Sequence, residues 1–457
     1  MVSFLRIFSL RNLLVLSLAL NVSLIWRVLY GKDSEAINGP SLDNKRKALR
    51  TDSMASEAQA TQTTHLYMPS SSSSSSSVDS NSRDRVINLD HGDPTVYERY
   101  WKQTGDKSTI LIPGWQSMSY FSDAGNLCWF LEPEFAKEII RLHKIVGNAV
   151  TEDRYIVVGT GSTQLYQAVL YALSPPDAAE PLSVVSAAPY YSSYPLITDC
   201  LKSGLYKWAG DALSFNKEGP YIELVTSPNN PDGHARQSVV NKSGGILVHD
   251  LAYYWPQYSP IAAAADHDIM LFTVSKSTGH AGMRIGWALV KDEEVAKKMV
   301  KYVELNTIGV SKDSQLRAAK VLQVATDGCK YPTSKEGSLF DFAASIMEER
   351  WNLLRAAVRQ SGLFTLPDFP PELCRFLNSS FAPRPAFAWL KCEAPIEDCE
   401  AFLRSNNILT RGGKHFGVGP QYVRISMLDR DENYDVFVER LSTIHRRQSM
   451  QVDETAE

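Results

Sequence analysis

Lys276 has the surroundings of a lysine that reacts as a nucleophile. An apolar stretch from Asp268 to Val274 precedes it, a turn rich in Ser and Gly follows, and Arg284 comes eight residues later. Burial disfavours the charged form of an amine, so the pKa falls and the neutral, nucleophilic form becomes available. An arginine is a strong ligand for an anion such as phosphate. The same residues also fit a lysine in a surface turn between two strands, and the rest of the chain must separate the two interpretations.

Two strand ends upstream carry the side chains that a pyridoxal ring requires. Asn230 follows one apolar stretch, and Asp250 ends the next, with Tyr253 three residues further on. An ionised carboxylate keeps a pyridine nitrogen protonated, and the protonated ring stabilises negative charge at a substrate's alpha carbon. Asn230 and Tyr253 can donate hydrogen bonds to the ring's phenolate oxygen. Their order along the chain predicts a pyridoxal 5′-phosphate site in which Lys276 is the catalytic residue.

A glycine-rich turn supplies the predicted phosphate site. Residues 155–158 form a short apolar strand, Gly-Thr-Gly-Ser-Thr follows, and a helix is expected from Gln164 to Leu173. Backbone N–H groups at a helix N-terminus attract a phosphate dianion, and Ser162 and Thr163 add hydroxyl donors. Ser275 and Arg284 are expected to complete this site. A glycine-rich turn after a strand is a weak motif alone, so its weight comes from the residues downstream.

From about Val86 to Leu441 the chain resembles the fold type I pyridoxal phosphate enzymes, and within them the alliinase-like family that includes plant tryptophan aminotransferases. The resemblance implies an α/β fold with a large, mostly parallel sheet and a smaller C-terminal α/β domain. It implies that Tyr191 stacks on the cofactor ring, that Arg424 and Gly92 bind substrate, and that Tyr120 reaches the phosphate of a neighbouring subunit in a homodimer. The matching segments are His91 to Thr95, Met118 to Asp123, Ala188 to Tyr191, Ser227 to Gly233, His249 to Trp255 and Ser275 to Trp287.

The resemblance also implies a reaction. It points to transfer of an amino group from L-tryptophan to a 2-oxo acid such as pyruvate, which forms indole-3-pyruvate, an auxin precursor. Two alternatives stay open: a carbon–sulfur lyase of the alliinase type, and a catalytically dead, membrane-anchored binding protein. Retention of Lys276, Asp250, Asn230, Tyr253 and Arg284 argues against the third. The cofactor residues do not separate the first two, because both reactions begin with the same steps.

Composition agrees with one large and one small domain. The chain has 457 residues, of which 44% are hydrophobic, and apolar runs alternate with helix-like stretches from Tyr155 to Val290, which is typical of a parallel sheet covered by helices. We expect a large domain over 86–362, a small domain over 363–447 and a tail over 448–457. The net charge of −4 gives no reason to expect a nucleic-acid partner, and no metal ligands are predicted.

The N-terminal region is expected to attach the protein to a membrane. Leu13 to Trp26 is almost wholly apolar and has arginines on both sides, which favours a single-pass signal anchor within 1–31. Residues 32–85, with eight consecutive serines, are expected to be a disordered tether. We expect the endoplasmic reticulum membrane and a cytosolic catalytic domain; a cleaved signal peptide is the rival interpretation. The six scattered cysteines do not indicate a disulfide framework.

Overall fold

The computed structural model describes residues 85–330 and 337–445, which hold all the predicted site residues. The predicted anchor and C-terminal tail, and the tether up to residue 84, lie outside the described residues and stay predictions. Within the described ranges, no helix is both long and apolar enough to cross a membrane.

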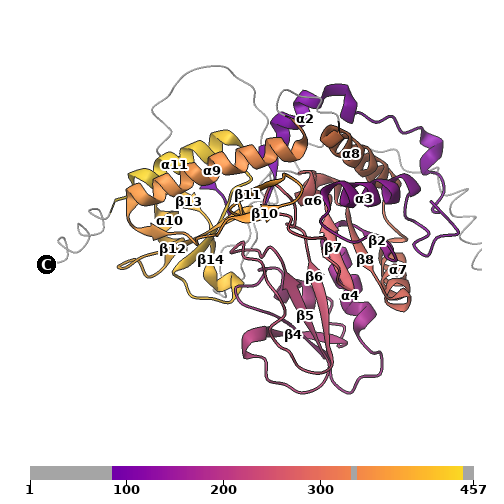
Figure 1. Cartoon of the computed structure of the whole chain (residues 1–457). Helices are drawn as coiled ribbons and strands as arrows, with labels where there is room; N and C mark the ends of the chain where they lie inside the picture. The colour runs from indigo at the N-terminus through magenta and orange to yellow at the C-terminus, as the bar shows by residue number, and fades with distance from the viewer. Residues whose placement is uncertain (1–84, 331–336, 446–457) are drawn as a thin grey trace, which may run out of the picture. The chain divides into compact units, whose positions relative to one another are not determined.

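A seven-stranded sheet forms the centre of the large domain (Figure 1). Its pairs are parallel except for β8, which runs antiparallel to both of its neighbours, so the prediction of a mostly parallel sheet is confirmed. Every residue of β5, β7 and β8 is buried, as expected for strands with helices on both faces. In spatial order the strands are β2 (Tyr155–Gly159), β8 (Gly286–Val290), β7 (Ile269–Thr273), β6 (Gly245–Asp250), β5 (Tyr221–Thr226), β3 (Leu182–Ser186) and β4 (Tyr206–Asp211).

Several helices have clear sequence signals for their ends. Asp292 caps α7 by accepting from the Val295 N–H at 2.8 Å, and Ser338 and Asp341 form a reciprocal capping box at the start of α9, which Gly362 ends in the left-handed conformation. These signals explain where α7 begins and where α9 begins and ends. The helices are α2 (Glu98–Thr104), α3 (Pro133–Val146), α4 (Gly161–Leu173), α5 (Tyr194–Asp199), α6 (Val274–Ser277), α7 (Glu293–Thr307), α8 (Lys312–Lys330), α9 (Leu339–Ser361), α10 (Cys399–Ser405) and α11 (Asp431–Thr443).

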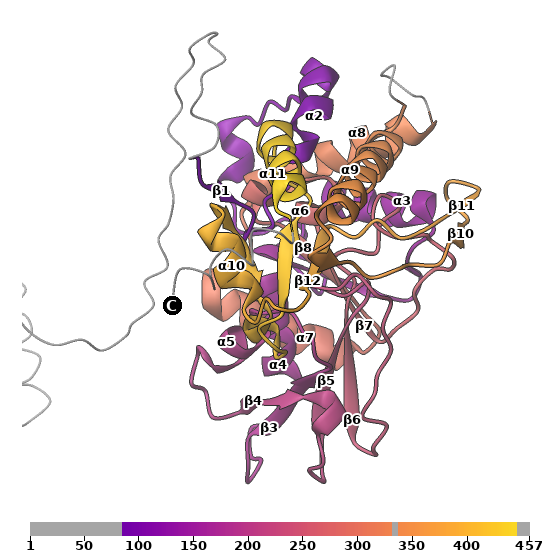
Figure 2. The same ribbon diagram turned by 90° about the vertical axis from the view of Figure 1, so that its left-hand side faces the viewer.

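A second, four-stranded sheet lies in the C-terminal part of the chain, and α9 and α11 lie side by side in both views (Figures 1 and 2). Its strands, in spatial order, are β14 (Arg411–Gly412), β15 (Tyr422–Ser426), β12 (Phe387–Cys392) and β9 (Phe364–Thr365). A short hairpin joins β10 (Glu372–Cys374) to β11 (Ser379–Phe381). The first strand, β1 (Ile87–Asn88), pairs in parallel with β13 (Ile408–Leu409), so the start of the described chain is attached to the C-terminal region.

The core beneath the large sheet contains a neutral histidine. Trp287 stacks on Phe272 with ring centroids 5.8 Å apart, and its indole N–H donates to Nε2 of His143 at 3.0 Å. Nδ1 of His143 lies 2.8 Å from the side-chain oxygen of Asn148, so the imidazole is a donor at one nitrogen and an acceptor at the other. Burial lowers the pKa of His143 to about 4. This histidine therefore belongs to the packing of the core.

Two features differ from the sequence expectations. Helix α8 was not among the helices expected from the sequence. Cys392 and Cys399 form a disulfide that joins the end of β12 to the start of α10. The sequence indicated no disulfide framework, and this single pair is a disulfide that it did not predict. Cysteine usage therefore no longer supports a cytosolic catalytic domain, since disulfides persist mainly in oxidising compartments.

We predict that Gly286→Ala destabilises the protein. A Cβ at residue 286 would lie 2.7 Å from the backbone nitrogen of Ser162 and 2.8 Å from the carbonyl oxygen of Phe272, and backbone atoms cannot move aside cheaply. Overpacking of this kind lowers the free energy of unfolding by about 1–3 kcal/mol. Chemical denaturation measures the change. The matched control is Gly282→Ala, because a Cβ at residue 282 meets open space; equal unfolding free energies for the two variants would contradict the prediction.

Candidate active site

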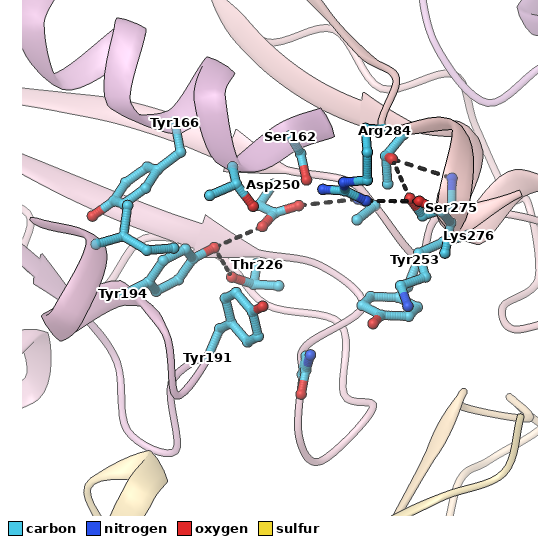
Figure 3. Close-up of a pocket in the computed structure, with 16 residues that line it drawn as sticks. Ser162, Tyr166, Tyr191, Tyr194, Thr226, Asp250, Tyr253, Ser275, Lys276 and Arg284 are labelled. Atoms are coloured by element: carbon cyan, nitrogen blue, oxygen red, sulfur yellow. Dashed lines mark hydrogen bonds between the residues drawn. The ribbon is translucent and has the colours of Figure 1, made fainter. Parts of the chain in front are cut away.

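The predicted cofactor residues meet at the carboxyl edge of the large sheet (Figure 3). Strands β2, β5, β6 and β7 all run in the same direction, so the loops that follow them lie at one edge, where ligands of open α/β sheets bind. These loops surround a cavity of about 190 Å³. Nine predicted residues line it: Ser162, Thr163, Tyr191, Asn230, Asp250, Tyr253, Ser275, Lys276 and Arg284.

Lys276 lies in α6, a single helical turn directly after β7, where the sequence had suggested an open turn. Its amine donates to the carbonyl oxygen of Gly92 at 2.5 Å. Burial lowers the pKa of Lys276 to about 8; the charges of Arg424 and Arg284 act in the same direction, and Asp93 opposes them. The neutral amine is thus available at mildly alkaline pH, as a nucleophile or a general base requires.

Asp250 ends β6 and points into the cavity (Figure 3). One carboxylate oxygen accepts from the hydroxyl of Tyr194 at 2.8 Å, and the other accepts from the backbone N–H of Ala252 at 3.1 Å. Tyr194 also lies 2.7 Å from the hydroxyl of Thr226, which fixes its orientation. Burial raises the pKa of Asp250, and the hydrogen bonds from Tyr194 and Ala252 partly offset this. The carboxylate is therefore oriented, but among the described residues no cationic side chain pairs with it.

Helix α4 directs its N-terminus at the cavity. It begins at Gly161, three residues earlier than predicted, so Ser162 and Thr163 lie in its first turn with their backbone N–H groups free of helical partners. Gly161 has a φ of +73°, a left-handed conformation that favours glycine. This turn presents backbone and hydroxyl donors together with the positive end of the helix dipole, which suits a phosphate group.

Arg284 completes the phosphate site from the opposite side. It too has a left-handed φ, of +54°, and Nη1 donates to the carbonyl oxygen of Ala281 at 2.8 Å. A Cβ on Gly161 would lie 2.6 Å from Nη2 of Arg284, so glycine is also required for the guanidinium to approach the helix. The hydroxyl of Ser275 accepts from Thr273 at 3.0 Å and lines the same cavity.

Arg424 lies beside the cavity on β15 and is buried, with 3% of its surface exposed. Nη1 donates to the side-chain oxygen of Asn230 at 3.1 Å and Nη2 to the carbonyl oxygen of Asp90 at 2.6 Å, while Nε has no hydrogen-bond partner within the described chain. Its guanidinium lies 4.1 Å from the ring centroid of Phe387. Burial, and then the charge of Arg411, lower the pKa of Arg424 to about 10.

Tyr253 and Asn230 each present a hydrogen-bond donor beside the cavity. Burial raises the pKa of Tyr253 well above its usual value, so its hydroxyl stays protonated. The side-chain oxygen of Asn230 faces Arg424, which leaves the NH₂ group as a donor. The amine of Lys276 lies 5.8 Å from the ring centroid of Tyr253, so all three groups border one space.

The structure does not bring every predicted residue into the cavity. Tyr120 is 72% exposed on a surface segment and does not line it; the predicted role in a neighbouring subunit is therefore untested. Gly92 contributes its backbone carbonyl to Lys276. Sequence reasoning missed Tyr194 and Thr226, since a tyrosine at a helix start and a threonine at a strand end carry no signal of their own.

Three charged groups fit pyridoxal phosphate and an amino-acid substrate. Asp250, Arg284 and Arg424 have no oppositely charged side chain within 4.0 Å among the residues that the structure describes. Arg424 is buried, and burying a charge without a partner is unfavourable, which points to a ligand that supplies the missing charge. Arg284 is exposed and lines the cavity, so its guanidinium is accessible to a ligand. A protonated ring nitrogen suits Asp250, a phosphate suits Arg284, and a substrate carboxylate suits Arg424. The fold and this donor set define a fold type I pyridoxal phosphate enzyme.

Comparisons with known proteins agree with this class and narrow it. The family model described as allinase matches residues 87–445. The chain is 61% identical over 439 residues to tryptophan aminotransferase-related protein 2 of Arabidopsis thaliana, and the aligned region covers 96% of this chain and 98% of that protein. It is 39% identical over 354 residues to alliin lyase 1 of Allium sativum, and the aligned region covers 75% of this chain and 72% of that protein.

Solved structures show the same fold at low sequence identity. An aminotransferase from Staphylococcus aureus superposes with a TM-score of 0.55 at 20% identity, over 78% of this chain and 93% of that chain. A variant of the Thermus thermophilus aspartate aminotransferase gives a TM-score of 0.54 at 18% identity, over 79% of this chain and 92% of that chain. The chain belongs to the alliinase family, and its cofactor is pyridoxal 5′-phosphate.

We predict that the amine of Lys276 titrates near pH 8 in the cofactor-free protein, because burial moves its pKa from 10.5 to about 8. The neutral form grows as pH rises through this value, so the initial rate of acetylation of Lys276 should reach half its maximum near pH 8. Peptide mass spectrometry after brief acetylation measures this rate. Lys297 is the control, since the hydrogen bonds that it donates to Glu294 and Glu293 raise its pKa. A midpoint for Lys276 above pH 10 would contradict the assignment.

Proposed function

We propose that the protein is an aminotransferase that converts L-tryptophan to indole-3-pyruvate and uses pyruvate or another 2-oxo acid as acceptor. The observation that carries the proposal is the common attachment of Lys276 and Arg424 to one backbone segment. Lys276 donates to the carbonyl of Gly92 and Arg424 to the carbonyl of Asp90, two residues apart. A substrate carboxylate on Arg424 therefore places its alpha carbon next to the amine of Lys276. The names of three relatives, each 58–61% identical to the chain, support tryptophan as donor.

Arg424 and Asp250 are binding residues, and Lys276 transfers the proton. Arg424 binds the substrate's alpha-carboxylate through its planar fork. When bound, pyridoxal phosphate stabilises negative charge at the substrate's alpha carbon. Asp250 holds the ring nitrogen in the protonated form, and Tyr194 keeps that carboxylate in place. Lys276, whose pKa lies near 8, removes the proton from the alpha carbon with Nζ and holds it for return.

A carbon–sulfur lyase is the second candidate. The matching family model is described as allinase, and several alliin lyases are 39% identical to the chain. A lyase uses the same removal of the alpha proton but then expels a group from the beta carbon, so the residues around Lys276 serve both reactions. The third possibility, a binding protein without activity, is opposed by the complete set of charged and donor groups around the cavity.

We predict that the protein loaded with cofactor forms indole-3-pyruvate from L-tryptophan and pyruvate, with alanine in equal amount. In a parallel reaction with an S-alkyl cysteine sulfoxide we expect no release of pyruvate above background. Chromatography of both mixtures measures the products. Lys276→Ala is the control: it should keep the circular dichroism spectrum and lose activity by about 10³-fold or more, since it removes the base. Release of pyruvate from the sulfoxide without indole-3-pyruvate from tryptophan would assign the lyase reaction instead.

We infer in addition that the active protein is a homodimer whose sites are shared between subunits. The surface segment that carries Tyr120 exposes a large apolar area, as expected of an interface. Its exposed side chains are Leu111, Trp115, Met118, Tyr120 and Phe121.

The test mixes two inactive variants, Tyr120→Ala and Lys276→Ala, after dissociation. Half of the randomly formed dimers are mixed, and each has one complete site, so activity should return to about a quarter of the wild-type value. Activity assays on the mixture, with mass spectrometry to count mixed dimers, provide the measurement. Mixed dimers without recovered activity would show that Tyr120 acts within its own subunit or not at all.

A further inference from the structure

A second arginine stands next to the one that is proposed to bind the substrate carboxylate. Arg411 on β14 is the direct cross-strand partner of Arg424 on β15. Directly opposed residues in an antiparallel pair project to the same face of the sheet, about 5 Å apart at Cβ. The charge of Arg411 is, after burial, the largest cause of the lowered pKa of Arg424. Two guanidinium groups are therefore directed at the same region.

The two arginines differ in what they bind. Nε and Nη2 of Arg411 donate to the two carboxylate oxygens of Asp90 at 2.5 Å and 3.2 Å, and Nη1 donates to the hydroxyl of Ser192 at 3.1 Å. The fork of Arg411 is thus filled, and its charge is neutralised. Within the described chain, the hydrogen bonds of Arg424 go to two uncharged oxygens, the backbone carbonyl of Asp90 and the side-chain oxygen of Asn230. The pair of arginines therefore leaves one positive charge for a ligand, not two.

The backbone holds Asp90 in this position independently of its side chain. The preceding residue, Leu89, donates its N–H to the carbonyl of Leu409 at 2.9 Å and accepts from the N–H of Ser426 at 3.0 Å. The bond from Arg424 goes to the main-chain carbonyl of Asp90, so it does not depend on the carboxylate. The carboxylate is therefore free to set the charge of the site without being needed to build it.

We propose that Asp90 makes the site selective for substrates with a single carboxylate, because it occupies the fork of Arg411 that would otherwise bind a second one. A distal carboxylate, as in a dicarboxylic 2-oxo acid, would be repelled by Asp90, because Asp90 already occupies the guanidinium of Arg411 that could otherwise bind it. A like charge or an unpaired charge in a binding site lowers affinity and so provides specificity. A substrate whose side chain has no charge contacts the Asp90–Arg411 ion pair, which has no net charge. The proposal rests on the function proposed above and names the class of its acceptor: monocarboxylic 2-oxo acids.

The experiment compares the cofactor-loaded full chain with its Asp90→Asn variant. With one amino donor, kcat/KM is measured for pyruvate and for 2-oxoglutarate. Asparagine keeps the shape but removes the charge, so the ratio of the value for 2-oxoglutarate to that for pyruvate should rise by about tenfold or more. The gain should disappear in the double variant Asp90→Asn with Arg411→Gln, and Asp90→Glu should keep the wild-type preference. Should Asp90→Asn fail to fold, Asp90→Ser provides the same comparison.

A binding measurement separates this proposal from the proposed reaction. Calorimetric titration with glutarate and with butyrate compares a dicarboxylate with a monocarboxylate without any turnover, so it applies equally if the protein proves to be a lyase. Asp90→Asn should tighten glutarate relative to butyrate by about tenfold, and only while Arg411 is present. The proposal would be overturned if Asp90→Asn changed neither the kcat/KM ratio of 2-oxoglutarate to pyruvate nor the affinity ratio of glutarate to butyrate. It would also be overturned if the gain for the dicarboxylate remained after the loss of Arg411. In either case Asp90 would be a structural residue.

Discussion

The site depends on one short backbone segment, Asp90 to Gly92, that lies between the lysine of the large sheet and the arginine of the small one. The carbonyl of Gly92 accepts from Lys276, and the carbonyl of Asp90 accepts from Arg424. Because β1 pairs with β13, this segment is attached to the C-terminal region, although its sequence position precedes the large domain. The distance between base and carboxylate ligand is therefore set by pairing between strands more than 300 residues apart.

Burial changes the pKa of both Asp250 and Lys276. The same removal of water raises the pKa of Asp250 and lowers the pKa of Lys276, because in each case it disfavours the charged form. The two groups differ in how the protein compensates. Tyr194 and a backbone N–H support the charge of Asp250, whereas Lys276 lies near two arginines that oppose its charge. One residue is thus prepared to pair with a cation and the other to act as a neutral base.

The sequence predicted those parts of the site that follow strand ends. Asp250, Asn230, Ser162 and Lys276 each come within a few residues of an apolar strand, and strands of one direction bring such residues to one edge. What it could not predict depends on contacts between distant segments. The pairing of β1 with β13, the bond from Tyr194 to Asp250 and the disulfide each join residues whose local patterns are ordinary. Arg424 was found only through family resemblance, since an arginine on a strand is more often part of a surface ion pair.

The ion pair between Asp90 and Arg411 shows why cofactor residues alone do not define a reaction. Residues that hold the ring and move the proton serve any chemistry that begins at the alpha carbon. Selection must come from groups that contact the part of the substrate beyond the alpha carbon. Asp90 and Arg411 are separated by 321 residues and bridge the first strand to the small sheet. Because they meet beside Arg424, a change in either charge alters which substrates fit while leaving Lys276 and Asp250 in place.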